Sequence, residues 1–280
     1  MKNVSCYNCR PPDSSFYASE NGFNLMKCCG CGLLYVNPRP NDEEIREAHE
    51  LGEHGGARTL NVTETFVSSK IPTYLKVLSD IYEDGRALAG TTWLDIGCGH
   101  GEFLCALKEF TKGKIVARGI EPNGYKQQSA RSRQLDVSYF DLDKHESKYD
   151  VISLLNVYSH LPDPIASLGN WKRLLNNNGE MLFETGDTAN FPSADHYRPF
   201  CLPDHLSFPS EEIVLDVLRR VGFQVVCVRK YPFITRSISR VVKEIAKIVW
   251  PGKHSRLKYL SNAQVYAETD MYVRAVLMNS

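Results

Sequence analysis

This chain of 280 residues has no net charge and no long apolar run, and its number of cysteines is odd. Lys plus Arg and Asp plus Glu both number 33, so the formal net charge is zero. Proteins that hold nucleic acid through its phosphates usually carry a basic field, so RNA or DNA is not the expected partner. No apolar run approaches the ~20 residues that span a bilayer, and the N-terminus lacks a signal-peptide core. We therefore expect a cytoplasmic protein without a transmembrane segment.

The cysteines favour metal binding over disulfides. Of the nine, five fall within the first 31 residues, where Cys6 and Cys9 form one CxxC and Cys28 and Cys31 a second. Two such turns supply the four thiolates that Zn²⁺ takes in a closed structural site. Cys28 is preferred to Cys29 because it alone has the two-residue gap to Cys31. The pattern predicts a zinc ribbon over residues 1–40; free thiols or a redox CxxC are the alternatives.

A linker or lid segment is expected over residues 41–70. The proline pair in "NPRP" ends the ribbon, and Asn41 or Asp42 is a suitable N-cap for an acidic helix start. The stretch "HELGEHGGARTLNVTETF" has weak periodicity and is interpreted as a loop, in which His49 and His54 are expected to be solvated rather than ligands or substrate contacts. Apolar residues at helical spacing over 71–88 then predict an amphipathic helix.

Strands and helices alternate from residue 91 onward. Strands are expected over 91–97, 114–120, 137–140, 149–155, 180–185, 223–231 and 272–279, and helices over 102–110, 124–134 and 164–175. Such alternation is typical of a doubly wound α/β fold, in which helices cover both faces of a mostly parallel sheet. Ligands of these sheets bind at the carboxyl ends of the strands.

One of those ends carries the most informative motif. The order is Asp95, Gly97, Gly99, Gly101, each two residues apart, between the first strand and a helix. Glycines allow a sharp turn and close approach of a ligand, whereas an acid before them suits an ammonium group better than a pyrophosphate. Glu121 ends the second strand, where an acid accepts hydrogen bonds from ribose hydroxyls. The motifs together predict a nucleoside ligand with a cationic, amino-acid-like tail.

Five motifs in order resemble the class I S-adenosylmethionine (SAM) dependent methyltransferases. They are "LDIGCGHGEF", "GIEP", "YDVISLLNVYSHLPDP", "LLNNNGEMLFE" and "DHLSFPSEEIVLDVLRRVGF". With the preceding ribbon, the chain resembles a branch that acts on sugars and small metabolites. The resemblance implies SAM and a structural Zn²⁺ as cofactors. It also implies a Rossmann-like sheet of seven strands, the last antiparallel, in a methyltransferase domain over residues 71–280.

The resemblance also implies roles at the cofactor site. The glycine loop with Asp95 would hold the methionine portion, and Glu121 the ribose. Pro122 would form part of the adenine wall, and Asp141, or its rival Asp143, would receive the adenine amino group. Asn156 would line the cofactor after the fourth strand.

The proton acceptor is expected among histidines near the acceptor. His205 in "PDHLSF" is the first choice, because the family places a histidine of this motif on the substrate side and imidazole titrates near neutral pH. His160 is the alternative, and Tyr197 beside His196 lies in the acceptor loop. Ser159 precedes His160 where many relatives have Glu, so no carboxylate is expected to orient that ring.

The predicted function is O-methylation of a sugar, glycan precursor or similar small metabolite. Carbon methylation of a nucleotide-linked keto sugar, an RNA methyltransferase and a non-catalytic cofactor-binding module are the alternatives. An insertion over 231–268 is expected to carry a basic helix near 236–250. Its apolar face would pack on its own domain or on a second copy in a homodimer; a membrane surface or anionic glycan is the other interpretation.

Overall fold

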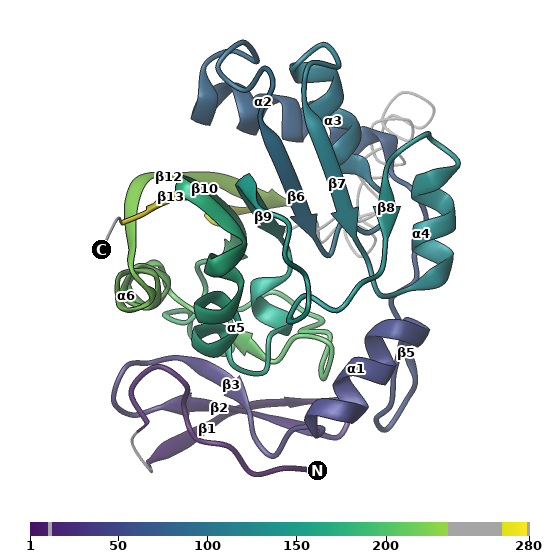
Figure 1. The fold of residues 1–280 in the computed structure, drawn as a ribbon. Helices are drawn as coiled ribbons and strands as arrows, with labels where there is room; N and C mark the ends of the chain where they lie inside the picture. Colours follow the sequence, from purple (N-terminus) through teal and green to yellow (C-terminus); the bar gives the residue numbers. More distant parts are fainter. Residues whose placement is uncertain (11–12, 235–264, 279–280) are drawn as a thin grey trace, which may run out of the picture.

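The computed structural model describes residues 1–10, 13–234 and 265–278. Its main sheet has seven strands in the order β12-β13-β10-β9-β6-β7-β8 (Figure 1). These are β6 (Thr92–Ile96), β7 (Val116–Ile120), β8 (Val137–Ser138), β9 (Tyr149–Leu155), β10 (Leu175–Gly186), β12 (Phe223–Ile234) and β13 (Val265–Leu277). The pairs from β8 to β10 are parallel, and β13 is antiparallel to both its neighbours. The predicted fold class, including the antiparallel last strand, is confirmed.

Helices cover both faces of this sheet (Figure 1). Helices α2 (Ile71–Tyr82), α3 (Glu102–Phe110) and α4 (Gly124–Arg131) lie on one side, and α5 (Pro164–Trp171) and α6 (Glu211–Val221) on the other. Successive residues of β10 serve opposite faces: Leu182 packs with Val77 of α2, whereas Phe183 packs with Leu168 of α5. A strand buried on both faces must be apolar on both, which explains the short apolar runs Val151-Ile152 and Leu154-Leu155 in β9 and Met181 to Phe183 in β10. Helix α2 ends at Tyr82, short of the predicted residue 88.

The N-terminal part forms a second, smaller sheet. Strands β1 (Ser14–Glu20), β2 (Phe23–Cys28) and β3 (Leu34–Val36) pair antiparallel, and β3 pairs with β11 (Ser207–Phe208) from the loop after β10. Leu25 and Leu34 pack with Phe200 and Phe208 in one buried cluster. The small sheet and the loop that follows β10 therefore share a core.

The segment predicted to be a linker is more ordered than expected. Helix α1 (Asp42–Leu51) begins at a capping box, in which Asn41 Oδ1 accepts from Glu44 N and Glu44 Oε2 accepts from Asn41 N. Strands β4 (Glu53–His54) and β5 (Leu60–Asn61) form a short hairpin, and the 3₁₀ helix η1 (Ser68–Lys70) leads into α2. The interpretation of residues 49–66 as a loop is therefore wrong at its start and at β5, because α1 runs through Leu51 and the two strands follow, and the rest of the range is irregular.

Two further 3₁₀ helices, η2 (Tyr158–His160) and η3 (Lys172–Leu174), flank α5. The predicted basic helix near 236–250 and most of the 231–268 insertion lie outside the described residues. Within the described ranges, β12 continues to Ile234 and β13 starts at Val265, so both ends of that segment belong to the main sheet. In the part of the chain that the structure describes, no helix has the length and apolarity to span a membrane.

Candidate cofactor and acceptor site

The glycine loop makes the expected tight turn between β6 and α3. Gly97, Gly99 and Gly101 all have positive φ, at 71°, 55° and 88°. A Cβ on Gly97 would lie 2.5 Å from Val157 Cγ2, and one on Gly101 would lie 2.3 Å from a Leu135 methyl group. Among the described residues, no heavy atom lies within 4 Å of a Cβ placed on Gly99, so they leave open space at the middle of the loop. The loop is thus packed at its two ends and open at its centre, as a cradle for a ligand would be.

Asp95 lies at the end of β6 beneath this loop. Its carboxylate is 2% exposed and accepts a 2.5 Å hydrogen bond from Ser153 Oγ of β9, which accepts one from Trp93 Nε1. Burial raises the pKa of Asp95 to about 7. No cation among the described residues pairs with this carboxyl, and an ammonium group at this position would restore the ordinary ionised form.

Glu121 braces the loop from the end of β7. Its Oε2 accepts from Gly99 N and its Oε1 accepts from Asn123 N, both at 3.0 Å, and the side chain is 5% exposed. Burial raises the pKa of this carboxyl. Each oxygen keeps a lone pair for a further donor, so the same carboxylate can position the loop and accept from ribose hydroxyls.

The remaining predicted cofactor residues are more exposed. Asp141 is solvent-exposed and pairs with Lys144 Nζ at 3.0 Å, which lowers the pKa of the carboxyl. Its Oδ1 also accepts from Asp143 N. Asn156 is exposed, with φ of 55°, and Pro122 is half-buried directly after Glu121. None of these side chains is tied into the core.

Residues 63–67, near the end of the expected linker or lid segment, contact the glycine loop. His100 Nε2 lies 2.8 Å from Thr63 O, and Glu102 Oε1 accepts from Val67 N at 2.8 Å. His100 and Glu102 are 4% and 8% exposed. Both belong to the "GHGE" part of the motif, so their polar atoms hold the linker against the loop. No periodic signal marks this contact in the sequence.

A cluster of histidines surrounds Asp204 at the carboxyl edge of β9. His160 Nδ1 lies 2.9 Å from Asp204 O and 3.0 Å from Asp204 Oδ1. The pairing is built by the backbone, because Leu206 N donates to Ser159 O at 2.8 Å. The expectation that no carboxylate orients His160 is therefore wrong: Asp204, from the loop after β10, supplies it. That pair is separated by 44 residues, which is why local motif reading missed it.

The electrostatics distinguish the two predicted bases. Burial lowers the pKa of His160, but the carboxylate of Asp204 outweighs it and raises the pKa above the usual value. His205, whose ring centroid is 4.7 Å from that of His160, has its pKa lowered to about 4 by burial. His160 is thus the more basic ring of the two, and His205 is neutral beside it.

His49 and His54 also reach this cluster. Their ring centroids are 5.4 Å apart, and His49 lies 6.0 Å from His160. His54 is 3% exposed and its Nε2 lies 3.0 Å from Asp204 Oδ1. The expectation of solvated loop histidines is therefore wrong, because the β4–β5 hairpin turns this segment inward.

His196 and Tyr197 lie among aromatic rings of the small sheet and the loop. The His196 ring is 4.9 Å from Phe200 and 4.4 Å from Tyr197, and burial lowers its pKa to about 4. Tyr197 packs against the core of the small sheet, 6.2 Å from Phe208. These two residues are placed to shape the loop that carries Asp204.

The four predicted zinc ligands come together. The Sγ atoms of Cys6 and Cys31 are 3.5 Å apart, those of Cys9 and Cys28 are 3.4 Å apart, and those of Cys6 and Cys9 are 3.9 Å apart. A tetrahedral ion with Zn–S bonds of ~2.3 Å would keep its sulfurs roughly 3.8 Å apart. All four ligand atoms lie within 4.8 Å of one another, and Cys29 is exposed outside the group. The thiols therefore fit one closed site.

Comparison with known proteins agrees with this geometry. The sequence profile of a family described as a methyltransferase domain matches residues 65–228. A tRNA U34 carboxymethyltransferase of Campylobacter jejuni is 31% identical over 210 residues, which are 68% of each chain. A ubiquinone biosynthesis O-methyltransferase of Pasteurella multocida is 28% identical over 182 residues, 52% of this chain and 74% of that one. The crystal structure of a SAM-dependent methyltransferase from Archaeoglobus fulgidus matches with a TM-score of 0.52 at 17% identity, covering 74% of this chain and 94% of that one.

The matched range contains the glycine loop, Asp95 and Glu121, and it ends within β12. These features fit SAM: the buried Asp95 carboxyl would meet its ammonium group, the Glu121 carboxylate would meet its ribose, and the loop leaves room for it at Gly99. This chain is an enzyme of the class I SAM-dependent methyltransferase family.

Proposed function

We propose that this enzyme transfers the SAM methyl group to an acceptor held above the carboxyl ends of β9 and β10, with His160 as the proton acceptor. The observation that carries the proposal is the contact of His160 Nδ1 with Asp204. Gly97 packs against Val157, only three residues before His160, so the dyad lies close to the cofactor loop. The base role expected of His205 accordingly moves to its neighbour.

The dyad supplies what proton abstraction needs. With its Nδ1–H donated to Asp204, His160 keeps the lone pair on Nε2 for the acceptor's proton, and the carboxylate stabilises the imidazolium that forms. SAM supplies an activated methyl group on a sulfonium that leaves as a neutral thioether. The chain's own work is then to align the acceptor with the methyl group and to remove one proton.

For the acceptor class, we infer a nucleoside of tRNA as the first candidate. The names of relatives such as the Campylobacter jejuni protein support it. The neutral overall charge argues against RNA, but the charge is uneven along the chain: residues 236–258 contain seven Lys or Arg residues and one Glu, a local net charge of +6. Such a stretch is suited to phosphate contacts.

A small-molecule hydroxyl is the second candidate, in line with the sugar or metabolite O-methylation expected from sequence. The small sheet joins the main domain through β11, and His49 of α1 lies against His160, so the dyad is enclosed on that side. The O-methyltransferase name of the Pasteurella multocida relative supports this class. Carbon methylation has no comparable support.

Zn²⁺ at the four cysteines is proposed as a structural ion. Four sulfur donors leave no open position for substrate, and Cys6 and Cys28 are buried beneath the small sheet. The ion would hold β2 and the N-terminal turn together, so that the small sheet can support the loop that carries Asp204.

The test is methyl transfer from radiolabelled SAM to bulk tRNA and, in parallel, to a panel of nucleotide sugars and glycan precursors. Labelled tRNA is expected, with tRNA binding that weakens as salt rises. Label in a sugar alone would replace the first acceptor with the second. With the acceptor known, His160→Ala should lower kcat by ~10²–10⁴-fold with S-adenosylhomocysteine (SAH) affinity unchanged. His145→Ala, which alters a histidine packed on Phe140, is the control. If His160→Ala keeps a kcat close to that of the wild type, His160 is not the proton acceptor.

A further inference from the structure

His49, His54 and Asp204 form a second group of convergent donor atoms, separate from the four cysteines. They come from three elements: the last turn of α1, strand β4 and the loop after β10. One ligand atom from each lies within 4.8 Å of the other two. His54 and Asp204 are 3% and 8% exposed, and His49 is half-buried.

Two of these donors have no hydrogen-bond partner among the described residues. His49 Nε2 and His54 Nε2 are both buried without one. His54 Nε2 lies 3.0 Å from Asp204 Oδ1, yet the contact lacks the geometry of a hydrogen bond. A buried polar atom left unpaired costs about 1–3 kcal/mol, so the arrangement favours a ligand that satisfies both nitrogens.

The separations suit a metal ion. An ion with bonds of ~2.1 Å to imidazole nitrogen and carboxylate oxygen, arranged tetrahedrally, keeps its ligand atoms roughly 3.4 Å apart. The 3.0 Å between His54 Nε2 and Asp204 Oδ1 is close to that value. Two imidazoles and one carboxylate are a donor set used by Zn²⁺ and other divalent transition metals, with a position left for water or substrate.

His160 fits the same arrangement as a supporting residue rather than a ligand. Its Nδ1 contacts both Asp204 O and Asp204 Oδ1, so the proton on that nitrogen is used to orient the carboxylate. Ligating carboxylates are commonly held in this way by a neighbouring donor. That is why the trio with His49 and His54 is the better ligand set than the trio of His160, Asp204 and His205.

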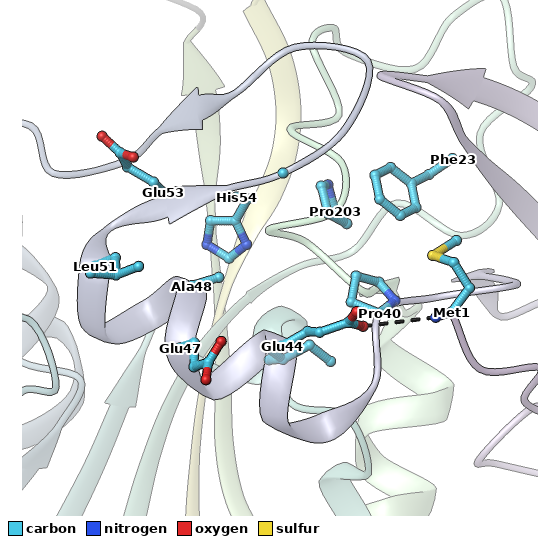
Figure 2. A pocket seen from close by; sticks show the side chains of 12 residues that line it. Met1, Phe23, Pro40, Glu44, Glu47, Ala48, Leu51, Glu53, His54 and Pro203 are labelled. Carbon is cyan, nitrogen blue, oxygen red and sulfur yellow. Dashed lines mark ion pairs between the residues drawn. The ribbon is translucent and has the colours of Figure 1, made fainter.

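An acidic pocket borders the cluster at His54. Figure 2 shows His54 between helix α1 and Pro203, on the wall of a pocket of about 350 Å³. Glu44, Glu47 and Glu53 line the same pocket. Negative charge around a concave surface raises the local concentration of cations, and His54 is the member of the trio that borders this pocket.

We propose that His49, His54 and Asp204 bind one divalent transition metal ion, Zn²⁺ being the first choice, with a coordination position left open. Its use in methyl transfer rests on the proposed function: an acceptor hydroxyl at the open position would become more acidic. Metal binding itself does not depend on that chemistry.

The test is the metal stoichiometry and ligand type of the full chain. Protein stripped with a chelator and titrated with Zn²⁺ should bind two ions, and X-ray absorption should show sulfur ligands for one and nitrogen and oxygen ligands for the other. His54→Ala and, as a second variant at a half-buried position, His49→Gln should each reduce the count from two to one and remove the nitrogen and oxygen signal. His145→Ala should still bind two ions. SAH binding by each variant checks that the fold is retained.

A wild-type protein that binds SAH but takes up only one ion, with sulfur ligands, would overturn the proposal. So would two ions in both His54→Ala and His49→Gln. These outcomes are separable from the proposed function. If His160→Ala loses methyl transfer while the wild type binds only one, sulfur-bound ion, the base is retained and the metal site is rejected. If the wild type binds two ions but transfers methyl to no acceptor, the metal site is retained and the proposed function is rejected.

Discussion

The carboxylate of Glu121 offers the sharpest test of the cofactor site. Glu121→Gln keeps the size of the side chain but replaces one acceptor oxygen with an NH₂ group. Because Gly99 N and Asn123 N each donate to a different oxygen at 3.0 Å, one backbone N–H must lose its acceptor. The same change removes the charge that would accept from ribose hydroxyls.

The expected magnitude follows from those bonds. A hydrogen bond to a charged group contributes about 1.5–3 kcal/mol, and every 1.4 kcal/mol corresponds to about tenfold in affinity. Calorimetry should therefore show the Kd for SAH rising by roughly 10- to 150-fold in Glu121→Gln. Glu109→Gln, which changes an exposed carboxylate on α3, should bind SAH as the wild type does.

Thermal unfolding of the ligand-free protein separates the two roles of this residue. A lower Tm together with an unchanged Kd would mean that Glu121 only braces Gly99, and the assignment of the ribose contact would be refuted. A raised Kd in Glu109→Gln as well would point to a general effect of charge.

Three further predictions concern Asp95, Gly101 and the cysteines. Burial raises the pKa of Asp95 to about 7, so its protonated form stabilises the ligand-free fold at low pH, and that contribution is lost as the pH rises through about 7. Because an ammonium group favours the ionised form, SAH binding at pH 6 should release up to about one proton from the Asp95 carboxyl. Calorimetry in buffers of different ionisation enthalpy measures this release. If Asp95→Asn releases as many protons as the wild type, the protons come from another group. Gly101→Ala should lower the unfolding free energy by roughly 2–4 kcal/mol, because the new side chain meets both a positive φ and a collision with Leu135. Gly113→Ala, with φ of 72° and no described atom near the new Cβ, should lower it by only about 1 kcal/mol. Equal losses of unfolding free energy in denaturant titrations would contradict the packing argument. Cys9→Ser should remove the sulfur-bound zinc and loosen the small sheet while SAH still binds, and Cys29→Ser should leave the metal content unchanged; retained zinc in Cys9→Ser would rule out the four-cysteine site.

Local patterns in the sequence were enough for the main sheet and the cofactor loop. Apolar runs alternating with helical periodicity predicted the parallel strands and their helices, because the spacing of apolar residues within each element reflects which of its faces is buried. The tight turn of Gly97, Gly99 and Gly101 was equally predictable, since only glycine tolerates positive φ there at low cost. The CxxC spacing likewise predicted which four cysteines would meet.

Tertiary structure alone decided how the histidine cluster around Asp204 is assembled. Asp204 meets His160 from a loop 44 residues away, and β11 joins β3 across a still longer separation. Val67 contacts Glu102 through a backbone N–H, which no side-chain pattern encodes. Contacts between loops have no period in the sequence, and their partners are chosen by the packing of the whole chain. The amino-acid sequence by itself thus determined the fold class and the SAM cradle, whereas the histidine cluster around Asp204 exists only because folding brings α1, β4 and two loops to one edge of the sheet.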